Sequence, residues 1–316
     1  MPRALITGAT GFAGSHLAEL CSRSGWDVHG TSLGSSDRRP VEAMTVHTVD
    51  LGEAGAFGRL VSSILPDRIF HLAGQASVAS AWADPAATLI GNILTTQRVL
   101  EAAHAHVPEA RLLIVSSGEV YGRPPLDVQP LGEGQPLRPS DPYAVSKVSV
   151  EYLALQHVLS FGMHVVRVRP FNHIGPRQRR GFVVADFAAQ LAAIERGEQP
   201  PVLRVGNLNA ARDFTDVRDT VRGYLMALED GLPGEVYNVC SGRAVQVADL
   251  LGRLLAACAV SVEVVADPAK QRPSDTPVLT GSAEALRQQT GWEARIPLDQ
   301  TLADTLAFWR SGSSGR

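Results

Sequence analysis

Short apolar runs alternate with longer segments of helical pattern through the first half of this 316-residue chain. The apolar runs predict strands, and the segments between them predict helices. Strands that alternate with helices at this pace form a doubly wound parallel sheet. The predicted strands are residues 4–7, 27–31, 45–49, 68–72, 111–115 and 164–169.

The second half of the chain predicts a smaller α/β lobe. The helices and strands expected in this half are residues 182–196, 201–205, 235–240, 247–257 and 298–310. Gly197 is a typical C-terminal stop for the first of these helices. We expect residues 1–170 to form a Rossmann-type domain, to which segments near residues 213–240 return. Residues 171–316 are expected to form the smaller, mostly C-terminal lobe.

The composition argues against several classes of protein. With 45% hydrophobic and 19% charged residues, the chain is typical of a soluble globular protein, and a net charge of −3 gives no electrostatic reason to expect nucleic-acid or membrane partners. No apolar run reaches membrane-spanning length, and a strand pattern that begins at Arg3 argues against a signal peptide. Cys21, Cys240 and Cys258 lack metal-ligand spacing, so we expect no metal site and a reducing, cytoplasmic location.

A glycine-rich turn connects the first strand to the first helix. Gly8 permits the tight turn, Gly11 lets backbone N–H groups approach a pyrophosphate, and Gly14 allows the helix to pack close to the strand. A chance glycine turn is the alternative, but strand, turn and helix stand in the order that dinucleotide binding requires. The expected cofactor contacts in this turn are Gly8, Thr10, Gly11, Phe12, Ala13 and Gly14.

The end of the second strand indicates which dinucleotide is bound. Cofactors with a free ribose 2′-hydroxyl usually meet an Asp or Glu there. This chain instead has Thr31 and Ser32, with Arg38 and Arg39 soon after. Guanidinium groups suit a 2′-phosphate, so the pattern favours NADP(H), with NAD(H) as the alternative cofactor. Both arginines could equally be solvated loop residues.

The other strand ends fall at the same edge of the predicted sheet. Ligands of doubly wound sheets bind beyond the carboxyl ends of the strands. This edge carries a carboxylate that can contact an adenine, a serine, and small residues that let a cofactor lie against the backbone. These further candidates for cofactor contacts are Asp50, Leu51, Leu72, Ala73, Gly74 and Ser116.

Tyr143 and Lys147 share one face of a predicted helix that begins at Pro142, with Asp141 as its N-cap. A phenol titrates near pH ~10, and a neighbouring ammonium favours the phenolate, so the pair can exchange a proton near neutral pH. The alternative is an ordinary surface lysine beside a half-buried tyrosine, because this spacing is common. Of the 29 basic residues, however, only Lys147 and Lys270 are lysines, which favours a chemical requirement for lysine.

Ser116-Ser117-Gly118-Glu119 ends the fifth strand and completes a Ser–Tyr–Lys set. On these motifs the chain resembles an extended short-chain dehydrogenase/reductase that acts on nucleotide sugars, over about residues 3–310. The resemblance implies that Ser117 holds a substrate carbonyl oxygen, that Tyr143 exchanges the proton, and that Lys147 lowers the phenol pKa and binds the nicotinamide ribose. It also implies a cofactor contact from Pro170.

Position 118 bears on the type of reaction. The 4,6-dehydratases of this family resemble Ser-Thr-Asp-Glu or Ser-Thr-Ser-Glu here, where the polar pair supports elimination of water from the sugar. In this chain the first of the pair is Gly118, which has no side chain to donate a proton. Glu119 remains, either as a base or as a structural residue. Gly118 therefore disfavours a dehydratase.

Further motifs resemble the GDP-mannose branch of the family. They are Phe171-Asn172-His173-Ile174-Gly175-Pro176, Val205-Gly206-Asn207-Leu208 with Arg212-Asp213-Phe214-Thr215-Asp216-Val217, and Arg272-Pro273-Ser274. The resemblance implies that the lobe binds the substrate through these motifs and through the arginines after Pro176. His173 is either catalytic or a residue that orders the site. The implied substrate contacts are Ser77, Ser117, Gly118, Glu119, Asn172, Arg179, Arg180, Arg212, Arg272 and Asp275.

The resemblance implies NADPH-dependent reduction of the C4 ketone of a GDP-linked 4-keto-6-deoxyhexose, GDP-4-dehydro-6-deoxy-D-mannose, to GDP-D-rhamnose. The alternatives are a GDP-mannose 4,6-dehydratase, a nucleotide-sugar 4-epimerase and, from another class, a non-catalytic NADP-binding regulator. The resemblance also implies a homodimer, in which the helices from Pro85 and from Pro142 form a four-helix bundle. The apolar candidates, which could equally pack on the sheet, are Leu89, Ile93, Val145, Val148, Leu153 and Leu155.

Overall fold

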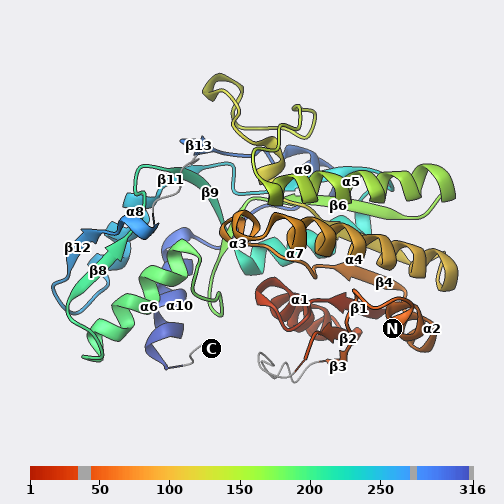
Figure 1. The fold of residues 1–316 in the computed structure, drawn as a ribbon, viewed down its shortest axis with the longest axis horizontal. Coiled ribbons are helices and arrows are strands. Elements are labelled where there is room, and N and C mark those ends of the chain that lie inside the picture. Colours follow the sequence, from red (N-terminus) through yellow and green to blue (C-terminus); the bar gives the residue numbers. More distant parts are fainter. Residues whose placement is uncertain (35–43, 271–275, 313–316) are drawn as a thin grey trace.

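A seven-stranded parallel sheet forms the centre of the larger part of the molecule (Figure 1). The computed structural model describes residues 1–34, 44–270 and 276–312. The strand order reverses between β4 and β1, which is where a doubly wound sheet opens its ligand crevice. The predicted fold class is confirmed. In spatial order the strands are β10 (Val236–Val239), β6 (Val165–Pro170), β5 (Arg111–Val115), β4 (Arg68–His71), β1 (Arg3–Thr7), β2 (Asp27–Ser32) and β3 (Thr45–Thr48).

Helices cover both faces of this sheet. One face packs against α2 (Ala56–Ile64), α4 (Pro85–His106) and α5 (Pro142–Phe161). The other packs against α1 (Phe12–Arg23), α7 (Val217–Asp230) and α9 (Glu284–Thr290). Successive strand residues point to opposite faces, so Ala4 and Ile6 enter the core beneath α1 whereas Leu5 enters the core beneath α4. Burial on both faces makes the strands apolar along most of their length, which explains why the sequence revealed them.

Local signals set the ends of the helix that carries Tyr143 and Lys147. Asp141 accepts a hydrogen bond from the N–H of Ala144, and Pro142 occupies the first turn. The helix ends before Gly162, whose φ of +67° lies in the left-handed region that favours glycine. This helix therefore starts at the residue that the sequence predicted.

The C-terminal part holds a second core between small sheets and helices. One four-stranded sheet contains β7 (Asn172–Ile174), β9 (Ala211–Asp216), β11 (Ala244–Gln246) and β13 (Val278–Leu279). A two-stranded sheet pairs β8 (Val202–Val205) with β12 (Glu263–Ala266). The helices of this part are α6 (Val183–Glu195), α8 (Val247–Ala256) and α10 (Leu298–Arg310). Between its visits to this part, the chain returns to the main sheet to add α7 and β10 (Figure 1).

Several short elements escaped the sequence prediction. Besides the short strands of the lobe other than β8, they include α3 (Val78–Ala83) and the 3₁₀ helices η1 (Gly118–Tyr121), η2 (Leu126–Val128) and η3 (Pro268–Lys270). Elements of this length are too short to display a hydrophobic period. Among the residues that the structure describes, no helix is long and apolar enough to cross a membrane.

Candidate active site

The structure brings the predicted serine, tyrosine and lysine together at the end of β5. Lys147 Nζ donates a hydrogen bond to the carbonyl oxygen of Val115, 2.9 Å away, and lies 5.8 Å from the centre of the Tyr143 ring. The Ser117 hydroxyl lies close enough to Tyr143 to lower the pKa of its phenol. Ser117 Oγ also accepts a hydrogen bond from the N–H of Glu119 at 3.2 Å. The three side chains are buried, so they form a fixed polar group at the edge where ligands of such sheets bind.

Burial changes the acidity of both members of the Tyr–Lys pair. It raises the pKa of Tyr143 far above its ordinary value, an effect that the Ser117 hydroxyl opposes and two nearby carboxylates reinforce. Burial also lowers the pKa of Lys147 to about 8. The sequence led us to expect that the ammonium would favour the phenolate. In this structure burial outweighs that effect, so Tyr143 is a neutral phenol that can donate its proton near pH 7.

A buried ion pair lies one helical turn beyond Lys147. Arg169 Nη2 is 2.8 Å from Glu151 Oε2, Arg169 Nε donates to Glu151 Oε1 at 2.9 Å, and neither side chain is more than 5% exposed. Ser116 Oγ donates to the same carboxylate at 2.5 Å. Glu151 opposes the effect of burial on the pKa of Lys147. Sequence reasoning missed this pair, because its partners lie on α5 and β6 and share no motif.

Gly118 packs against an aromatic ring. A Cβ atom added at this position would lie 3.0 Å from ring atoms of Phe171, which is closer than ordinary van der Waals contact. Phe171 is 4% exposed, and its ring centre lies 6.1 Å from that of Tyr121. A side chain at position 118 therefore requires this ring to shift. The position that lacks an acidic side chain also has little room for one.

The glycine turn after β1 is closed tightly. A Cβ atom at Gly14 would lie 2.2 Å from the carbonyl oxygen of Gly8, and one at Gly8 would lie 3.0 Å from the backbone of Ala73. Gly8 also has a φ of +68°. Among the described residues, no side chain caps the start of α1 at Gly11, which leaves the first-turn N–H groups for a phosphate. These features fit the pyrophosphate of a dinucleotide, as the sequence predicted.

A buried histidine supports the neighbouring strand end. Thr7 Oγ1 accepts hydrogen bonds from the N–H groups of Leu72 and Ala73, both at 3.1 Å, so its own hydrogen is directed to His71 Nδ1 at 2.8 Å. The Nε2 atom of His71 then carries the ring hydrogen and donates to Thr96 Oγ1 at 3.0 Å. Burial, assisted by a nearby ammonium, lowers the pKa of His71 to about 3, so the ring is neutral. The segment that includes Leu72 and Ala73 is thereby fixed.

Most other predicted cofactor residues also lie at this edge. Thr10, Phe12 and Ala13 belong to the glycine turn and the start of α1. Arg38, on which the preference for NADP(H) partly rests, lies outside the described residues. Those at or just beyond strand ends are Thr31, Ser32, Asp50, Leu51, Gly74 and Pro170.

The predicted substrate residues come from both parts of the molecule. Ser77 caps α3, where its side chain accepts a hydrogen bond from the N–H of Ser80. Asn172 begins β7 in the lobe, and Arg212 of β9 donates from Nη1 to the carbonyl oxygen of Thr276 at 2.6 Å. The candidates thus come from several elements in both parts of the molecule.

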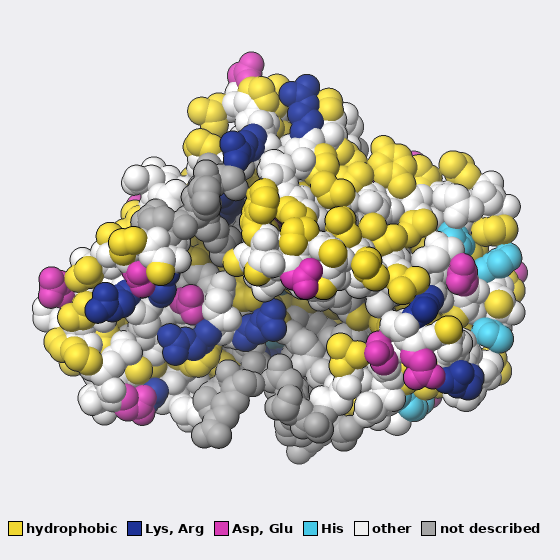
Figure 2. All heavy atoms as spheres, in the orientation of Figure 1, with side chains coloured by type: hydrophobic (Ala, Val, Ile, Leu, Met, Phe, Trp, Pro, Cys, Tyr) yellow, Lys and Arg dark blue, Asp and Glu magenta, His cyan; other side chains and the backbone are white. Residues whose placement is uncertain are grey.

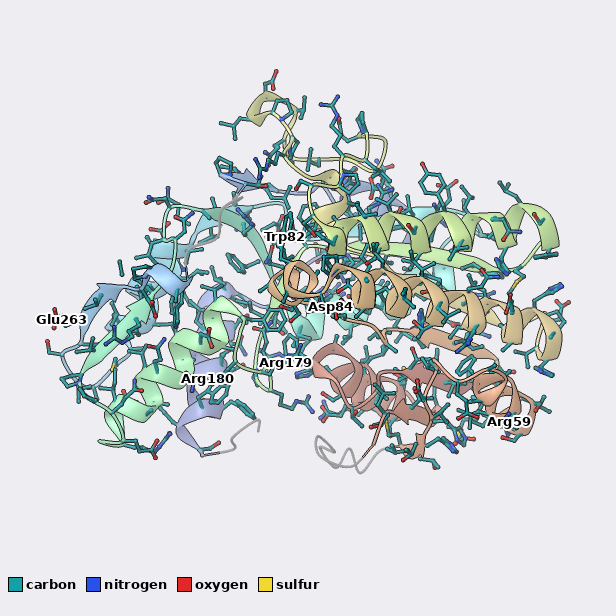
Figure 3. The ribbon with its side chains drawn as sticks, viewed as in Figure 1. Arg59, Trp82, Asp84, Arg179, Arg180 and Glu263 are labelled. Atoms are coloured by element: carbon teal, nitrogen blue, oxygen red, sulfur yellow. The ribbon has the colours of Figure 1, made fainter. Side chains whose placement is uncertain are left out.

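Two further arginines are exposed on the segment that leads into α6 (Figure 3). Arg179 lies 6.0 Å from the centre of the Phe182 ring, and Arg180 Nε is 3.8 Å from Asp186 Oδ1. The predicted contacts Arg272 and Asp275 lie outside the described residues.

A parallel sheet with a glycine turn after β1 and a Ser–Tyr–Lys set beside β5 defines a short-chain dehydrogenase/reductase of the nucleotide-sugar type. The family model described as GDP-mannose 4,6 dehydratase matches residues 5–305, and the chain belongs to this family.

Proteins with assigned names match nearly the full chain. GDP-6-deoxy-D-mannose reductase of Pseudomonas aeruginosa is 38% identical over 310 residues, which cover 98% of this chain and 97% of that protein. A GDP-mannose 4,6-dehydratase of Yersinia enterocolitica is 28% identical over 351 residues, covering 97% and 93%. The solved structure of RMD from Pseudomonas aeruginosa complexed with NADPH is similar with a TM-score of 0.88 and 37% identity, covering 99% of this chain and all of that one.

Proposed function

We propose that this protein uses NADPH to reduce the C4 ketone of GDP-4-dehydro-6-deoxy-D-mannose, which gives GDP-D-rhamnose. The observation that carries the proposal is the placement of Ser117 and Lys147 beside Tyr143, at a strand end where Gly118 supplies no further acid. The 38% identity to a GDP-6-deoxy-D-mannose reductase supports the same substrate and the same type of reaction.

Each member of the catalytic set has a role that its geometry allows. Bound NADPH would supply the hydride. The Ser117 hydroxyl lies beside the Tyr143 phenol, so a ketone oxygen placed between them could accept a hydrogen bond from each. Tyr143, kept neutral by burial, passes its proton to that oxygen. Lys147 keeps a positive charge close to the phenolate that remains, and Glu119 borders the sugar.

The proposed cofactor is NADP(H) in preference to NAD(H). The described residues after β2 offer no carboxylate to a ribose 2′-hydroxyl, and a similar structure holds NADPH. The cofactor domain would consist of residues 1–170 with segments near 213–240, together with α9, which packs on the same sheet, and the lobe would bind the substrate. We assign cofactor contacts to Gly8, Thr10, Gly11, Phe12, Ala13, Gly14, Thr31, Ser32, Arg38, Asp50, Leu51, Leu72, Ala73, Gly74, Ser116, Tyr143, Lys147 and Pro170.

Substrate binding is proposed to combine the strand end with the lobe. Guanidinium groups suit a diphosphate, and the lobe supplies several of them. The assigned substrate contacts are Ser77, Ser117, Gly118, Glu119, Asn172, Arg179, Arg180, Arg212, Arg272 and Asp275.

The free thiols of Cys21, Cys240 and Cys258 support a reducing, cytoplasmic location.

A GDP-mannose 4,6-dehydratase is the second candidate. The family model carries that description, and Glu119 keeps a carboxylate at the strand end. The two functions differ in their need for cofactor, because the reductase consumes NADPH whereas a dehydratase returns the hydride to its own substrate. Oxidation of NADPH by purified protein in the presence of enzymatically prepared GDP-4-dehydro-6-deoxy-D-mannose, with one NADPH used per sugar, tests the proposal. Formation of the 4-keto sugar from GDP-mannose without added cofactor would favour the dehydratase instead.

The pH dependence of the reaction is expected to follow Lys147. A lysine is charged below its pKa, and this pKa is about 8, so the charge beside Tyr143 is present at neutral pH and is lost as the pH rises through that value. We expect kcat/KM for the sugar to be constant between about pH 6.5 and 7.5 and to fall above about pH 8. Initial rates at saturating NADPH measure this profile. A rate that stays constant up to about pH 10 would contradict it.

The protein is proposed to form a homodimer through α4 and α5. Hydrophobic side chains gather over these two helices on the surface (Figure 2). Among the residues predicted for this interface, only Val145 is exposed; the other five are half-buried, and Val148 and Leu153 pack against inner clusters. The exposed apolar residues of the two helices are Ile90, Leu94, Val145, Tyr152, Leu159 and Phe161.

A double substitution, Ile90→Glu with Tyr152→Glu, is expected to convert the dimer to a monomer. Two charges placed on each copy of a self-complementary surface would face their symmetry-related counterparts and would have to be desolvated. Sedimentation equilibrium measures the mass, and Leu126→Glu, on the exposed η2 segment outside α4 and α5, is the matched control. A wild-type protein that sediments as a monomer would contradict the dimer.

A further inference from the structure

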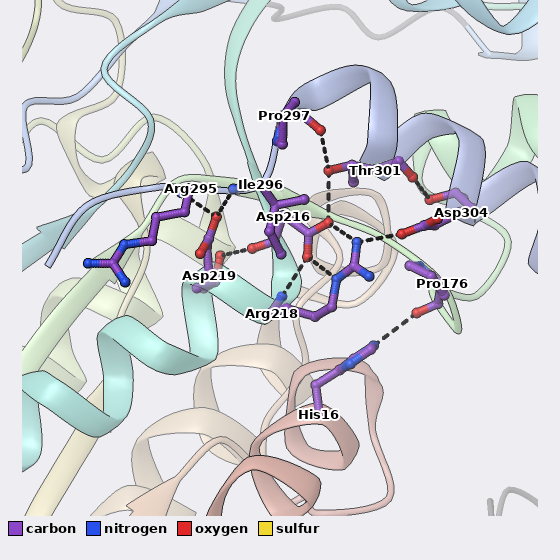
Figure 4. Close-up of polar contacts among 12 residues, drawn as sticks. His16, Pro176, Asp216, Arg218, Asp219, Arg295, Ile296, Pro297, Thr301 and Asp304 are labelled. Carbon is purple, nitrogen blue, oxygen red and sulfur yellow. Dashed lines mark hydrogen bonds and ion pairs between the residues drawn. The ribbon is translucent and has the colours of Figure 1, made fainter.

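The segment that follows β7 crosses the start of the cofactor-binding helix α1. The ring of His173 stacks on the ring of Phe12, with centres 5.7 Å apart and an angle of 6° between the planes. The carbonyl oxygen of Pro176 lies 3.0 Å from His16 Nε2 (Figure 4). The lobe and the sheet domain are therefore joined directly beside the glycine turn.

Arg177 makes the strongest bonds in this junction. Its Nη1 and Nη2 atoms pair with the two carboxylate oxygens of Glu19 at 2.5 and 3.0 Å. Nη2 also donates to His16 Nδ1 at 2.6 Å. The backbone of Arg177 has a φ of +74°, a left-handed conformation that an arginine adopts only at a cost. The side-chain bonds compensate this strain, because they hold the residue where its backbone alone would not favour it.

The hydrogen bonds define the state of His16. A carbonyl oxygen only accepts, so the contact with Pro176 places the ring hydrogen on Nε2, and Nδ1 accepts from Arg177 Nη2. With this assignment the longer contact between Arg177 Nε and Nε2, at 3.3 Å, is not a hydrogen bond. Burial and the adjacent guanidinium lower the pKa of His16 to about 4. The imidazole is thus neutral, and it donates to the carbonyl oxygen of Pro176 and accepts from the guanidinium of Arg177.

The junction lies between the two groups of residues that must meet for reaction. Phe12 belongs to the glycine turn assigned to the cofactor pyrophosphate, and His16 lies one helical turn further along α1. Pro176 and Arg177 follow Asn172 and His173, which enter the lobe sheet as β7. The side chain of Gln178, 4% exposed, donates back to the carbonyl oxygen of His173 at 3.0 Å. Residues 172–178 therefore behave as one unit, held against α1 at its far end.

A separate polar contact joins α7 to α10. Asp216 caps α7, accepts a hydrogen bond from Thr301 Oγ1 and pairs with Arg218, which also reaches Asp304 (Figure 4). That contact fixes the lobe helices to the sheet domain. Segment 172–178 is held by other contacts: β7 pairs with β9, His173 stacks on Phe12, and His16 and Glu19 of α1 bind Pro176 and Arg177.

We propose that Arg177 is a positioning residue for the reaction. By binding Glu19 and His16 it fixes segment 172–178 against the cofactor-binding helix and so sets the distance between the bound sugar and the nicotinamide. The proposal rests on the proposed reductase function for its kinetic consequence. The tie between the segment and α1 stands on the contacts alone.

Arg177→Ala and Arg177→Gly together test the proposal. Both remove the guanidinium, but only glycine relieves the left-handed backbone. We expect kcat/KM for the sugar to fall about 10- to 100-fold in both variants, because small displacements of reacting groups cost rates of this order, while the Kd of NADPH changes less than about twofold. Arg23→Ala, on the exposed last turn of the same helix, is the control and is expected to match wild type. If the glycine variant keeps wild-type kinetics, the bonds of Arg177 are not needed and the proposal fails.

Glu19→Gln provides a second route, which keeps the shape of the partner and removes its charge. It is expected to give an intermediate loss of kcat/KM, and it tests the pair if either Arg177 variant fails to fold. Hydrogen–deuterium exchange of residues 172–178 in the absence of sugar is expected to increase in all three variants. The exchange measurement needs no substrate, so it tests whether Arg177 holds segment 172–178 against α1 independently of activity. If the wild-type protein does not turn over the GDP sugar, only the reductase function is rejected. Unchanged exchange in the variants would overturn the tie.

Discussion

Replacing Tyr143 by phenylalanine is expected to lower turnover of GDP-4-dehydro-6-deoxy-D-mannose about 1,000-fold, within the range that general acid catalysis contributes, and to leave NADPH affinity within about twofold of wild type. The substitution keeps the ring, which is 7% exposed, and removes the hydroxyl beside Ser117. The ketone oxygen then loses its proton donor, whereas the glycine turn that would hold the pyrophosphate is untouched.

Steady-state NADPH oxidation and a fluorescence titration of NADPH measure the two quantities separately. Tyr152→Phe is the matched control, since it removes the same hydroxyl from an exposed position on the same helix. Turnover by Tyr143→Phe within about tenfold of wild type would contradict its assigned role.

Glu151→Gln is expected to destabilise the protein by about 3–5 kcal/mol, the usual cost of removing one partner from a buried ion pair. The carboxylate neutralises Arg169, and the two side chains are 1% and 5% exposed. A neutral amide leaves the guanidinium buried with only neutral acceptors, the Tyr121 hydroxyl and the carbonyl oxygen of Glu133. It also removes the charge that opposes the effect of burial on the pKa of Lys147, so the alkaline fall in kcat/KM should move to lower pH.

Thermal unfolding compares this variant with Glu101→Gln, an exposed glutamate on α4 that is expected to unfold like wild type. The double variant Glu151→Leu with Arg169→Met should be more stable than Glu151→Gln, because it removes both buried charges. If Glu151→Gln unfolds at the wild-type temperature, the ion pair does not stabilise this site.

The sequence predicts those parts of the site that depend on local structure. The glycine turn requires only neighbouring residues, and the tight contact of Gly14 with Gly8 explains the glycine at both positions. Tyr143 and Lys147 share a helical face because of their spacing alone. The parallel sheet follows from buried strands whose two faces are both apolar.

Contacts between distant segments could not be predicted in the same way. Phe171 packs against Gly118, and Arg177 reaches Glu19, but nothing in the spacing of these residues marks them as partners. The interface helices show the same limit. Their sequence contains apolar residues on several sides, and only the packing of α4 against α5 decides that Ile90 and Tyr152 are exposed whereas Ile93 and Leu153 are half-buried.

The acidity of Tyr143 shows why burial must be known before a pKa is argued. A lysine four residues away favours a phenolate when both groups are solvated. Once the phenol is buried, the neutral form is favoured more strongly, and the pKa of Tyr143 rises. For a ketone reduction the neutral form is the useful one, because the reaction consumes a proton at the substrate oxygen.

The most direct test of the central proposal follows the hydride. Purified protein is supplied with GDP-4-dehydro-6-deoxy-D-mannose and with NADPH in which both hydrogens at C4 of the nicotinamide are deuterium, and the product is examined by NMR. A reductase places one deuterium at C4 of the sugar for each NADPH oxidised. If no deuterium enters the sugar, and the protein instead converts GDP-mannose to the 4-keto sugar without added cofactor, the protein is a dehydratase and the proposed reduction is wrong.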